Sequence, residues 1–445
     1  MNARNPASLA RLCCGGLFTS VALALYMGTA GPLLHAGPLE EYVRRPDATS
    51  GWKILESTNR AGLEVLHVQL TSQTWHGNLW VHDLQIVRPA EVRNPHSVFL
   101  LISGDGDGLS SLSLLRLMAE RAGTMAAVLT SVPFQPLYER KEDALIAYTF
   151  DQYLRTDDAT WPLLLPMVKS AVRAMDAIQE VARTEYRERV DKFVVSGASK
   201  RGWTTWLTGA VDPRVQAIAP MVIDMLNMKA QTQWARRVYG RQSEQIRDYT
   251  DLNLIEKMDT PPMQKLVQFV DPFAYRSRYN MPKLLLLGTN DPYWTVDSLR
   301  HYWDELPGAK LIFQTPNAGH DLAGGRDASQ TLAAFYEMVV EGKTLPKMNW
   351  EFIKEGARSL RVEVKVDQPA KTFRLWTADC PDRDFRKARW TAQPLAAAAG
   401  GLAASTNVTA QATGFRASLV EAILVSPSGH EYRLSTEARV VPDLP

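Results

Sequence analysis

Short apolar runs alternate with amphipathic stretches along residues 98–340, and this alternation predicts buried strands covered by helices. The apolar runs are predicted strands, at 98–102, 125–134, 192–197, 215–223, 283–291 and 309–320. The amphipathic stretches are predicted helices, at 112–121, 142–154, 168–183, 203–210, 296–306 and 329–340. Strands that alternate with helices in this way form a mostly parallel sheet with helices on both faces, which is the α/β class of fold.

In the regions before and after this alternation, the hydrophobic pattern repeats every two residues, as in half-buried strands. Polar and apolar residues alternate loosely over 52–87, which predicts antiparallel strands joined near residues 72–77. Clean alternation returns in LRVEVKV at 360–366 and continues in later segments. A small all-β, sandwich-like domain is therefore expected at the C-terminal end of the chain.

The first 36 residues have the features of a secretory signal peptide. Arg4 and Arg11 precede an apolar stretch at 12–27, and small residues follow it. Cleavage after Ala30 or Ala36 is expected to leave a periplasmic or secreted protein without stable membrane insertion; an uncleaved membrane anchor is the alternative. The expected organisation is a signal peptide at 1–36, an α/β domain at 37–345 with a cap-like insertion near 225–280, and a β-sandwich-like domain at 346–445.

Charge and cysteine content narrow the functional classes. The formal net charge is +2 and the basic residues form no long run, so no nucleic-acid partner is expected. Only Cys380 remains after signal cleavage, so no intramolecular disulfide framework is expected. The fold must then rely on an ordinary apolar core, which a chain of 445 residues can build.

The segment VVSGASKRGWTTW, at 194–206, places one serine between a buried strand and a helix. A sharp strand-to-helix turn lifts such a side chain above the sheet, where Ser199 would be a nucleophile. The segment departs from the G-x-S-x-G pattern because Arg201 occupies the position of the second glycine, which follows at Gly202. Capping of the helix by Ser199 is the alternative interpretation.

A serine hydroxyl needs a base and a group that orients the base. Asp291 ends one predicted strand and His320 follows the next, so the chain order serine, acid, histidine is the one expected for this architecture. His320 is therefore the predicted base and Asp291 its predicted partner. Asp297 and Asp224 are fallback acids, whereas Asp321 is less suitable because it adjoins the histidine.

Backbone amides are the expected donors to an oxyanion, and no metal or cofactor is needed. One is the amide of Lys200; the other is expected from the glycine-rich loop after residues 98–102, at Gly104 or Asp105. The Asp105 and Asp107 carboxylates are expected to point away from the oxyanion or to bind a cation. Lys200 and Arg201 supply nearby positive charge, or form a solvated pair at a helix start.

The polar segment 225–280 has the length and position of a cap over the site. Two interpretations of its large side chains stay open, a substrate cleft and ordinary surface. The side chains in question are those of Trp234, Arg236, Arg237, Tyr239 and Tyr249.

The segments VVSGASKRGWTTWLTGAVDPRVQAIAPMVIDMLN, LLLLGTNDPYW, PNAGHDL and RLWTADCPDRDFRKARW resemble the PhoPQ-activated pathogenicity-related (PqaA-type) family over residues 40–441. The resemblance implies an exported α/β-hydrolase fold with a C-terminal β domain, and it carries Ser199, Asp291 and His320 onto the triad positions. It also implies a link to bacterial virulence and antimicrobial-peptide resistance. The loop SGDGDG departs from the Gly-Gly start that is usual in such hydrolases.

Two functions follow from these observations. The first is a serine hydrolase that forms an acyl-enzyme on a small peptide or ester. The hydrolase core of the family is similar to prolyl oligopeptidases, and this analogy favours a peptidase over a carboxylesterase. The second is a non-catalytic pseudo-hydrolase that binds a peptide or an envelope component.

Overall fold

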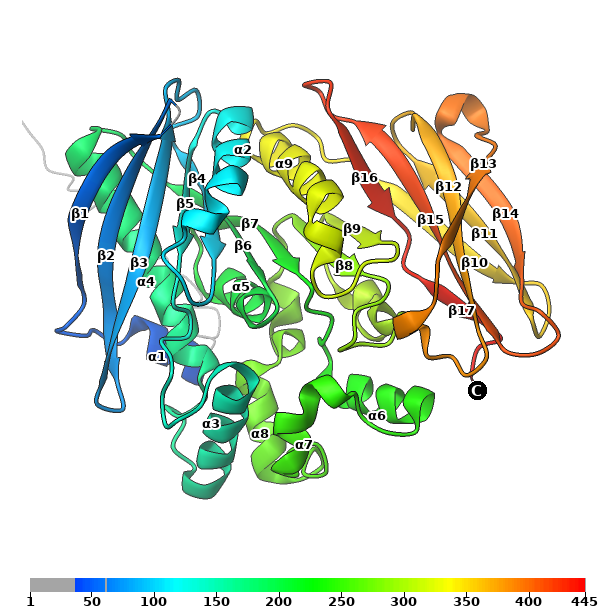
Figure 1. Ribbon diagram of the computed structural model, residues 1–445, viewed down its shortest axis with the longest axis horizontal. Coiled ribbons are helices and arrows are strands. Elements are labelled where there is room, and N and C mark those ends of the chain that lie inside the picture. Colours follow the sequence, from blue (N-terminus) through cyan, green and yellow to red (C-terminus); the bar gives the residue numbers. More distant parts are fainter. Residues whose placement is uncertain (1–36, 61, 445) are drawn as a thin grey trace, which may run out of the picture. The chain divides into compact units, whose positions relative to one another are not determined.

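A computed structural model describes residues 37–60 and 62–444 (Figure 1). These described residues form one compact unit, so the expected domain boundary after residue 345 stays a prediction. The predicted signal peptide lies outside the described residues. Within the part of the chain that is described, no helix combines the length and apolarity needed to cross a membrane.

One large sheet forms the centre of the α/β region, in the order β1-β2-β3-β5-β4-β6-β7-β8-β9. The β1–β2, β2–β3 and β3–β5 pairs are antiparallel. All the pairs from β5 through β4, β6, β7 and β8 to β9 are parallel. The strands are β1 (Gly51–Arg60), β2 (Leu63–Trp75), β3 (Asn78–Pro89), β4 (Ser97–Ile102), β5 (Met125–Leu129), β6 (Lys192–Ala198), β7 (Val215–Met221), β8 (Lys283–Gly288) and β9 (Lys310–Thr315).

Helices cover both faces of this sheet, as the alternating pattern predicts. Successive residues of β4 enter different cores: Leu100 packs with the helices α4 and α5, and Phe99 packs with α2 and α9. The α-helices are α1 (Pro38–Arg44), α2 (Leu112–Ala122), α3 (Glu142–Thr156), α4 (Leu164–Glu185), α5 (Lys200–Val211), α6 (Met228–Tyr239), α7 (Arg247–Asp251), α8 (Pro261–Val270) and α9 (Arg326–Val340).

Two antiparallel sheets follow α9 (Figure 1). Both contribute to one apolar core, for example through Val364 of β11 and Val420 of β15, so they are arranged like a sandwich. One sheet has the order β10-β11-β14, with strands Met348–Lys354, Ser359–Val366 and Ala403–Thr409. The other has the order β13-β12-β15-β16, with β17 paired to β15, and its strands are β12 (Thr372–Cys380), β13 (Thr391–Leu395), β15 (Phe415–Val425), β16 (Glu431–Ser435) and β17 (Arg439–Val441).

The predicted helix at 296–306 is wrong. Two short 3₁₀ turns, Ser298–His301 and Trp303–Glu305, stand there instead. Tyr302 separates them with a φ of −154°, and its buried hydroxyl donates a 2.6 Å hydrogen bond to Asp224. Tertiary burial of this side chain therefore overrides the amphipathic pattern.

Candidate active site

Ser199 lies in a strained turn between β6 and α5. Its φ and ψ are 58° and −126°, a conformation that few residues other than glycine adopt. Its backbone N–H donates to the carbonyl of Met221 at 2.9 Å, and its carbonyl accepts from Trp203 at 3.0 Å. Ser199 occupies the N-cap position of α5, but within the described residues its side chain makes no capping hydrogen bond.

Close packing explains the spacing of the two glycines around this turn. A Cβ atom on Gly197 would lie 2.6 Å from the carbonyl oxygen of Arg201, and one on Gly202 would lie 2.7 Å from Ile223 Cγ2. Neither position can carry a side chain without a shift of its neighbours. In this chain the second glycine therefore follows one residue later than in G-x-S-x-G. Gly202, and not Arg201, is the residue of α5 whose backbone packs closely against the end of β7.

Asp291 and His320 are joined by a hydrogen bond. The Nδ1 atom of His320 is 2.8 Å from Oδ2 of Asp291, whose other oxygen accepts from the Tyr293 amide at 3.0 Å. The ring centroids of Tyr293 and His320 are 4.5 Å apart. The Nε2 atom of His320 is buried and has no hydrogen-bond partner among the described residues. The contact with Asp291 favours the tautomer in which Nε2 carries the lone pair.

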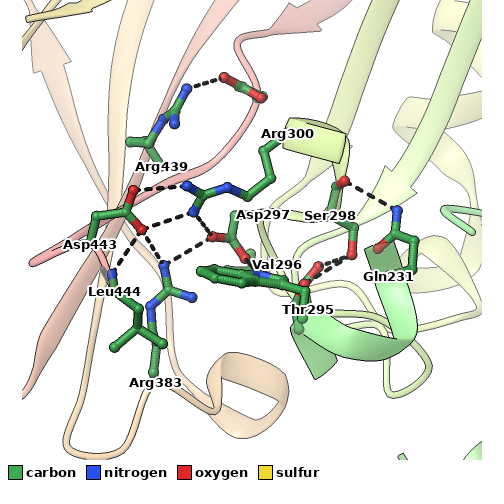
Figure 2. Close-up of polar contacts among 12 residues, drawn as sticks. Gln231, Thr295, Val296, Asp297, Ser298, Arg300, Arg383, Arg439, Asp443 and Leu444 are labelled. Carbon is green, nitrogen blue, oxygen red and sulfur yellow. Dashed lines mark hydrogen bonds and ion pairs between the residues drawn. The ribbon is translucent and has the colours of Figure 1, made fainter. Parts of the chain in front are cut away.

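The three other candidate acids have different partners. Asp297 accepts hydrogen bonds from Trp234 and two arginines (Figure 2). Asp224 accepts from Tyr302, and burial raises the pKa of this carboxyl to about 7. Asp321 caps a turn through the amide of Ala323, at 3.1 Å. Asp291 is therefore the candidate acid that the fold brings to His320.

The cations after Ser199 form a half-buried ion-pair cluster, not a solvated pair. Arg201 donates to both oxygens of Glu142, at 2.7 and 2.6 Å. Burial would raise the pKa of Glu142, but the Arg201 guanidinium lowers it to about 2. Lys200 Nζ lies 2.9 Å from Asp143 Oδ2, and the other oxygen of Asp143 accepts from Tyr249 at 3.0 Å. This cluster holds the start of α5 against the start of α3.

The predicted oxyanion loop lies against the same arginine. A Cβ atom on Gly104 would be 2.5 Å from Arg201 Nη2, so any side chain there would have to displace the guanidinium. The Asp105 carboxylate accepts from Gln135 at 2.9 Å and pairs with Lys141 at 3.3 Å. The Asp105 carboxylate thus pairs with a cationic side chain, as expected. The role of the Lys200, Gly104 and Asp105 amides as oxyanion donors stays a prediction.

An apolar cavity of about 90 Å³ opens beside Ser199. Tyr249 is the one residue of the five predicted cleft residues that lines it; Trp234, for example, is buried against Asp297 instead. The sequence pattern missed the apolar part of the wall, because methionine and isoleucine in a polar segment carry no distinctive signal. The lining side chains are Asp143, Ser199, Lys200, Trp203, Ile223, Met225, Met228, Gln231, Thr232, Ile246, Tyr249, Ile255, Met258, Tyr293 and Trp294.

Comparisons with known proteins agree with this architecture. The model of the family described as PhoPQ-activated pathogenicity-related protein matches residues 39–386. Autocrine proliferation repressor protein A of Dictyostelium discoideum is 32% identical over 376 residues, which are 78% of this chain and 76% of that protein. An acetyl xylan esterase from Paenibacillus sp. R4 superposes with a TM-score of 0.50 at 14% identity, covering 67% of this chain and 92% of the esterase. The likeness to this structure confirms the α/β-hydrolase fold.

Proposed function

The chain belongs to the PhoPQ-activated pathogenicity-related protein family, and from this premise we propose that it is a serine hydrolase that cleaves esters of short apolar acids. The observation that carries the proposal is Ser199, held in a strained turn at the wall of an apolar cavity. The hydrogen-bonded pair of Asp291 and His320 supports the proposal. Tyr293 connects this pair to the cavity, because it lines the cavity and its ring packs against the ring of His320.

In the proposed reaction, His320 is the general base. Its Nε2 atom takes the proton of the Ser199 hydroxyl while Oγ attacks the ester carbonyl carbon. Asp291 keeps Nδ1 protonated and stabilises the imidazolium that forms. His320 then gives the proton to the leaving alcohol, and water releases the acid from Ser199 by the same sequence of steps.

Two backbone amides are proposed to bind the oxyanion. Lys200 begins α5, and amides in the first turn of a helix have no partner within the helix. The second amide would come from Gly104 or Asp105. The Asp105 side chain favours this arrangement, because its negative charge is directed to Lys141 and Gln135. Loss of one such donor typically lowers kcat by about a hundredfold to a thousandfold.

The cavity favours an ester of a short acid over a peptide. An apolar cavity of roughly 150 Å³ holds a benzene molecule, so a cavity of about 90 Å³ suits an acyl chain of about two to four carbons. Asp143 is a carboxylate in its wall, but it is already bound by Lys200 and Tyr249. It therefore offers no free charge to the amino group of a peptide.

The proposed function includes export of the mature protein. The N-terminal segment has the pattern of a cleaved signal peptide, so the site of action would be the periplasm or the medium. The pathogenicity named in the family description fits an envelope substrate.

Hydrolysis of p-nitrophenyl acetate, butyrate and octanoate by the purified mature protein tests this function. We expect turnover of acetate and butyrate, weak turnover of octanoate, and loss of turnover in Ser199→Ala and His320→Ala. Ser57→Ala, at an exposed site on β1, is the matched control and should act like the wild type. Cleavage of aminoacyl p-nitroanilides in place of all three esters would favour the peptidase. No turnover of either class would favour the non-catalytic binding protein.

A change in the cavity wall sharpens this test. Met228 lines the cavity and is only partly buried, so Met228→Trp should narrow the cavity without a large loss of stability. Butyrate turnover should fall roughly tenfold or more relative to acetate, because each methylene in such a pocket is worth about 10- to 200-fold. An unchanged ratio of butyrate to acetate turnover would show that the acyl group binds elsewhere.

A further inference from the structure

Two asparagines tie the catalytic loops to the C-terminal β region. Asn290 directly precedes Asp291, and its Nδ2 atom donates to the carbonyls of Ala388 at 2.7 Å and Phe385 at 3.1 Å. Asn317 lies three residues before His320. Its side chain donates to the carbonyl of Trp390 at 2.9 Å and accepts from the Trp390 amide at 2.8 Å. The segment 385–390 therefore binds both loops through its own backbone.

The two loops are also bound directly to one another. The Thr289 hydroxyl accepts from the Asn317 amide at 3.0 Å and donates to Asn290 Oδ1 at 2.8 Å. A Cβ atom on Gly288 would lie 2.4 Å from the carbonyl oxygen of Ala318, so the loops are in close contact there. Movement of one loop must then move the other.

The segment 385–390 is anchored in an apolar core of its own. Phe385 and Trp390 are each only 2% exposed, and they pack with side chains of β12, β15 and β17. Just before the segment, Arg383 binds Asp297 at 3.0 Å and Asp443 at 3.2 Å (Figure 2). These contacts give the segment a fixed position from which it can orient the loops.

We infer that the C-terminal β region contributes to the catalytic site, because residues 385–390 fix the positions of Asp291 and His320 relative to each other through Asn290 and Asn317. This inference rests on the proposed function. Asn290 and Asn317 are positioning residues, since they bind the segment 385–390 and neither lines the cavity. Small displacements of a base cost about a hundredfold in rate, so loss of these contacts should lower turnover far more than binding.

Steady-state kinetics of Asn290→Ala, Asn317→Ala and the double variant on p-nitrophenyl acetate test the inference. We expect kcat to fall about tenfold to a hundredfold while KM changes less than about twofold. Asn280→Ala is the matched control, since Asn280 is exposed and its side chain donates to the Ser277 carbonyl in the same turn.

Folding defects are separated from positioning by two further measurements. The melting temperature of each variant is recorded, and Asn290→Ser provides a milder change that retains a short polar side chain. A lower melting temperature with wild-type kcat and KM would overturn the inference. Wild-type kinetics in both alanine variants would overturn it as well.

The inference also has a readout that needs no activity. The proton shared by His320 Nδ1 and Asp291 should give a far-downfield proton NMR signal in the wild type and in Asn280→Ala. We expect the signal to shift or vanish in Asn290→Ala and Asn317→Ala. If the wild type hydrolyses no ester, the proposed function fails, yet loss of this signal in the variants still supports the positioning role. An unchanged signal in both variants would contradict that role.

Discussion

Asp291 and Asp297 lie six positions apart after the same strand and are both buried, yet their surroundings differ completely. The Asp291 carboxylate is hydrogen-bonded to the imidazole of His320, and the Nε2 atom of this imidazole has no partner in the described part of the chain. Asp297 meets the guanidinium groups of Arg300 and Arg383, at 3.1 and 3.0 Å. Both are buried aspartates in the segment that follows β8, so the partner of each carboxylate decides which of them is available for catalysis.

The charged groups around Asp297 also set it apart from Asp291. Burial would raise the pKa of Asp297, but Arg383, Trp234 and Arg300 together lower it. Arg383 is itself only 2% exposed along its side chain, and it also binds Asp443 near the end of the chain. This cluster joins the α/β region to the C-terminal strands (Figure 2). Its expected role is therefore stability, whereas that of the Asp291–His320 pair is catalysis.

The largest expected effect comes from neutralising the two carboxylates in turn. Asp291→Asn should lower kcat on p-nitrophenyl acetate by about 10⁴-fold, because an amide favours the wrong imidazole tautomer. Asp297→Asn should retain kcat per folded molecule and lose stability instead. Steady-state rates and thermal melts of both variants check this contrast. The opposite assignment, with Asp297 needed for turnover and Asp291 dispensable, would reverse the two roles.

Arg383→Met should give the next largest effect. It leaves the buried Asp297 with one charged partner fewer, and breaking a buried ion pair typically costs about 3–5 kcal/mol. Urea unfolding should show this loss as a lower midpoint. Arg416→Met is the control, since Arg416 pairs with the more exposed Asp379 and such pairs contribute about 0–1 kcal/mol. Equal losses in the two variants would remove the distinction between buried and exposed pairs.

A third buried carboxyl, Asp224, should give the smallest effect and a characteristic dependence on pH. Burial raises its pKa to about 7 despite the hydrogen bond from Tyr302. The folded state then binds more protons than the unfolded state between about pH 4 and 7, so stability falls as the pH rises through this window. Asp224→Asn should abolish that fall and gain stability relative to the wild type at pH 8. Parallel stability profiles for the two proteins would contradict the raised pKa.

The sequence pattern was sufficient for the strands of the parallel sheet, for most of the helices that cover it and for the serine turn. Apolar runs such as 98–102 are buried on both faces, and the glycines around Ser199 mark a close approach that only glycine permits. The order of Ser199, Asp291 and His320 also placed the acid next to the base, because parallel strands end at one edge of the sheet.

Features that depend on distant side chains had no local signal. The helix expected at 296–306 fails because Tyr302 turns toward Asp224. Trp234 was a candidate for the cleft but is buried between Arg300 and Arg383, 4.4 and 4.8 Å from its ring centre. The roles of Asn290 and Asn317 depend on a segment about 70 to 100 residues later in the chain, which no local pattern can reveal.

Covalent labelling with a fluorophosphonate tests whether Ser199 is an activated nucleophile. The mature protein is incubated with the probe, digested, and the modified residue is located by mass spectrometry. We expect one adduct on Ser199 in the wild type and in Asp297→Asn, and no adduct in Ser199→Ala or His320→Ala. A folded wild-type protein that acquires no adduct, or an adduct that persists in Ser199→Ala, would contradict an activated Ser199.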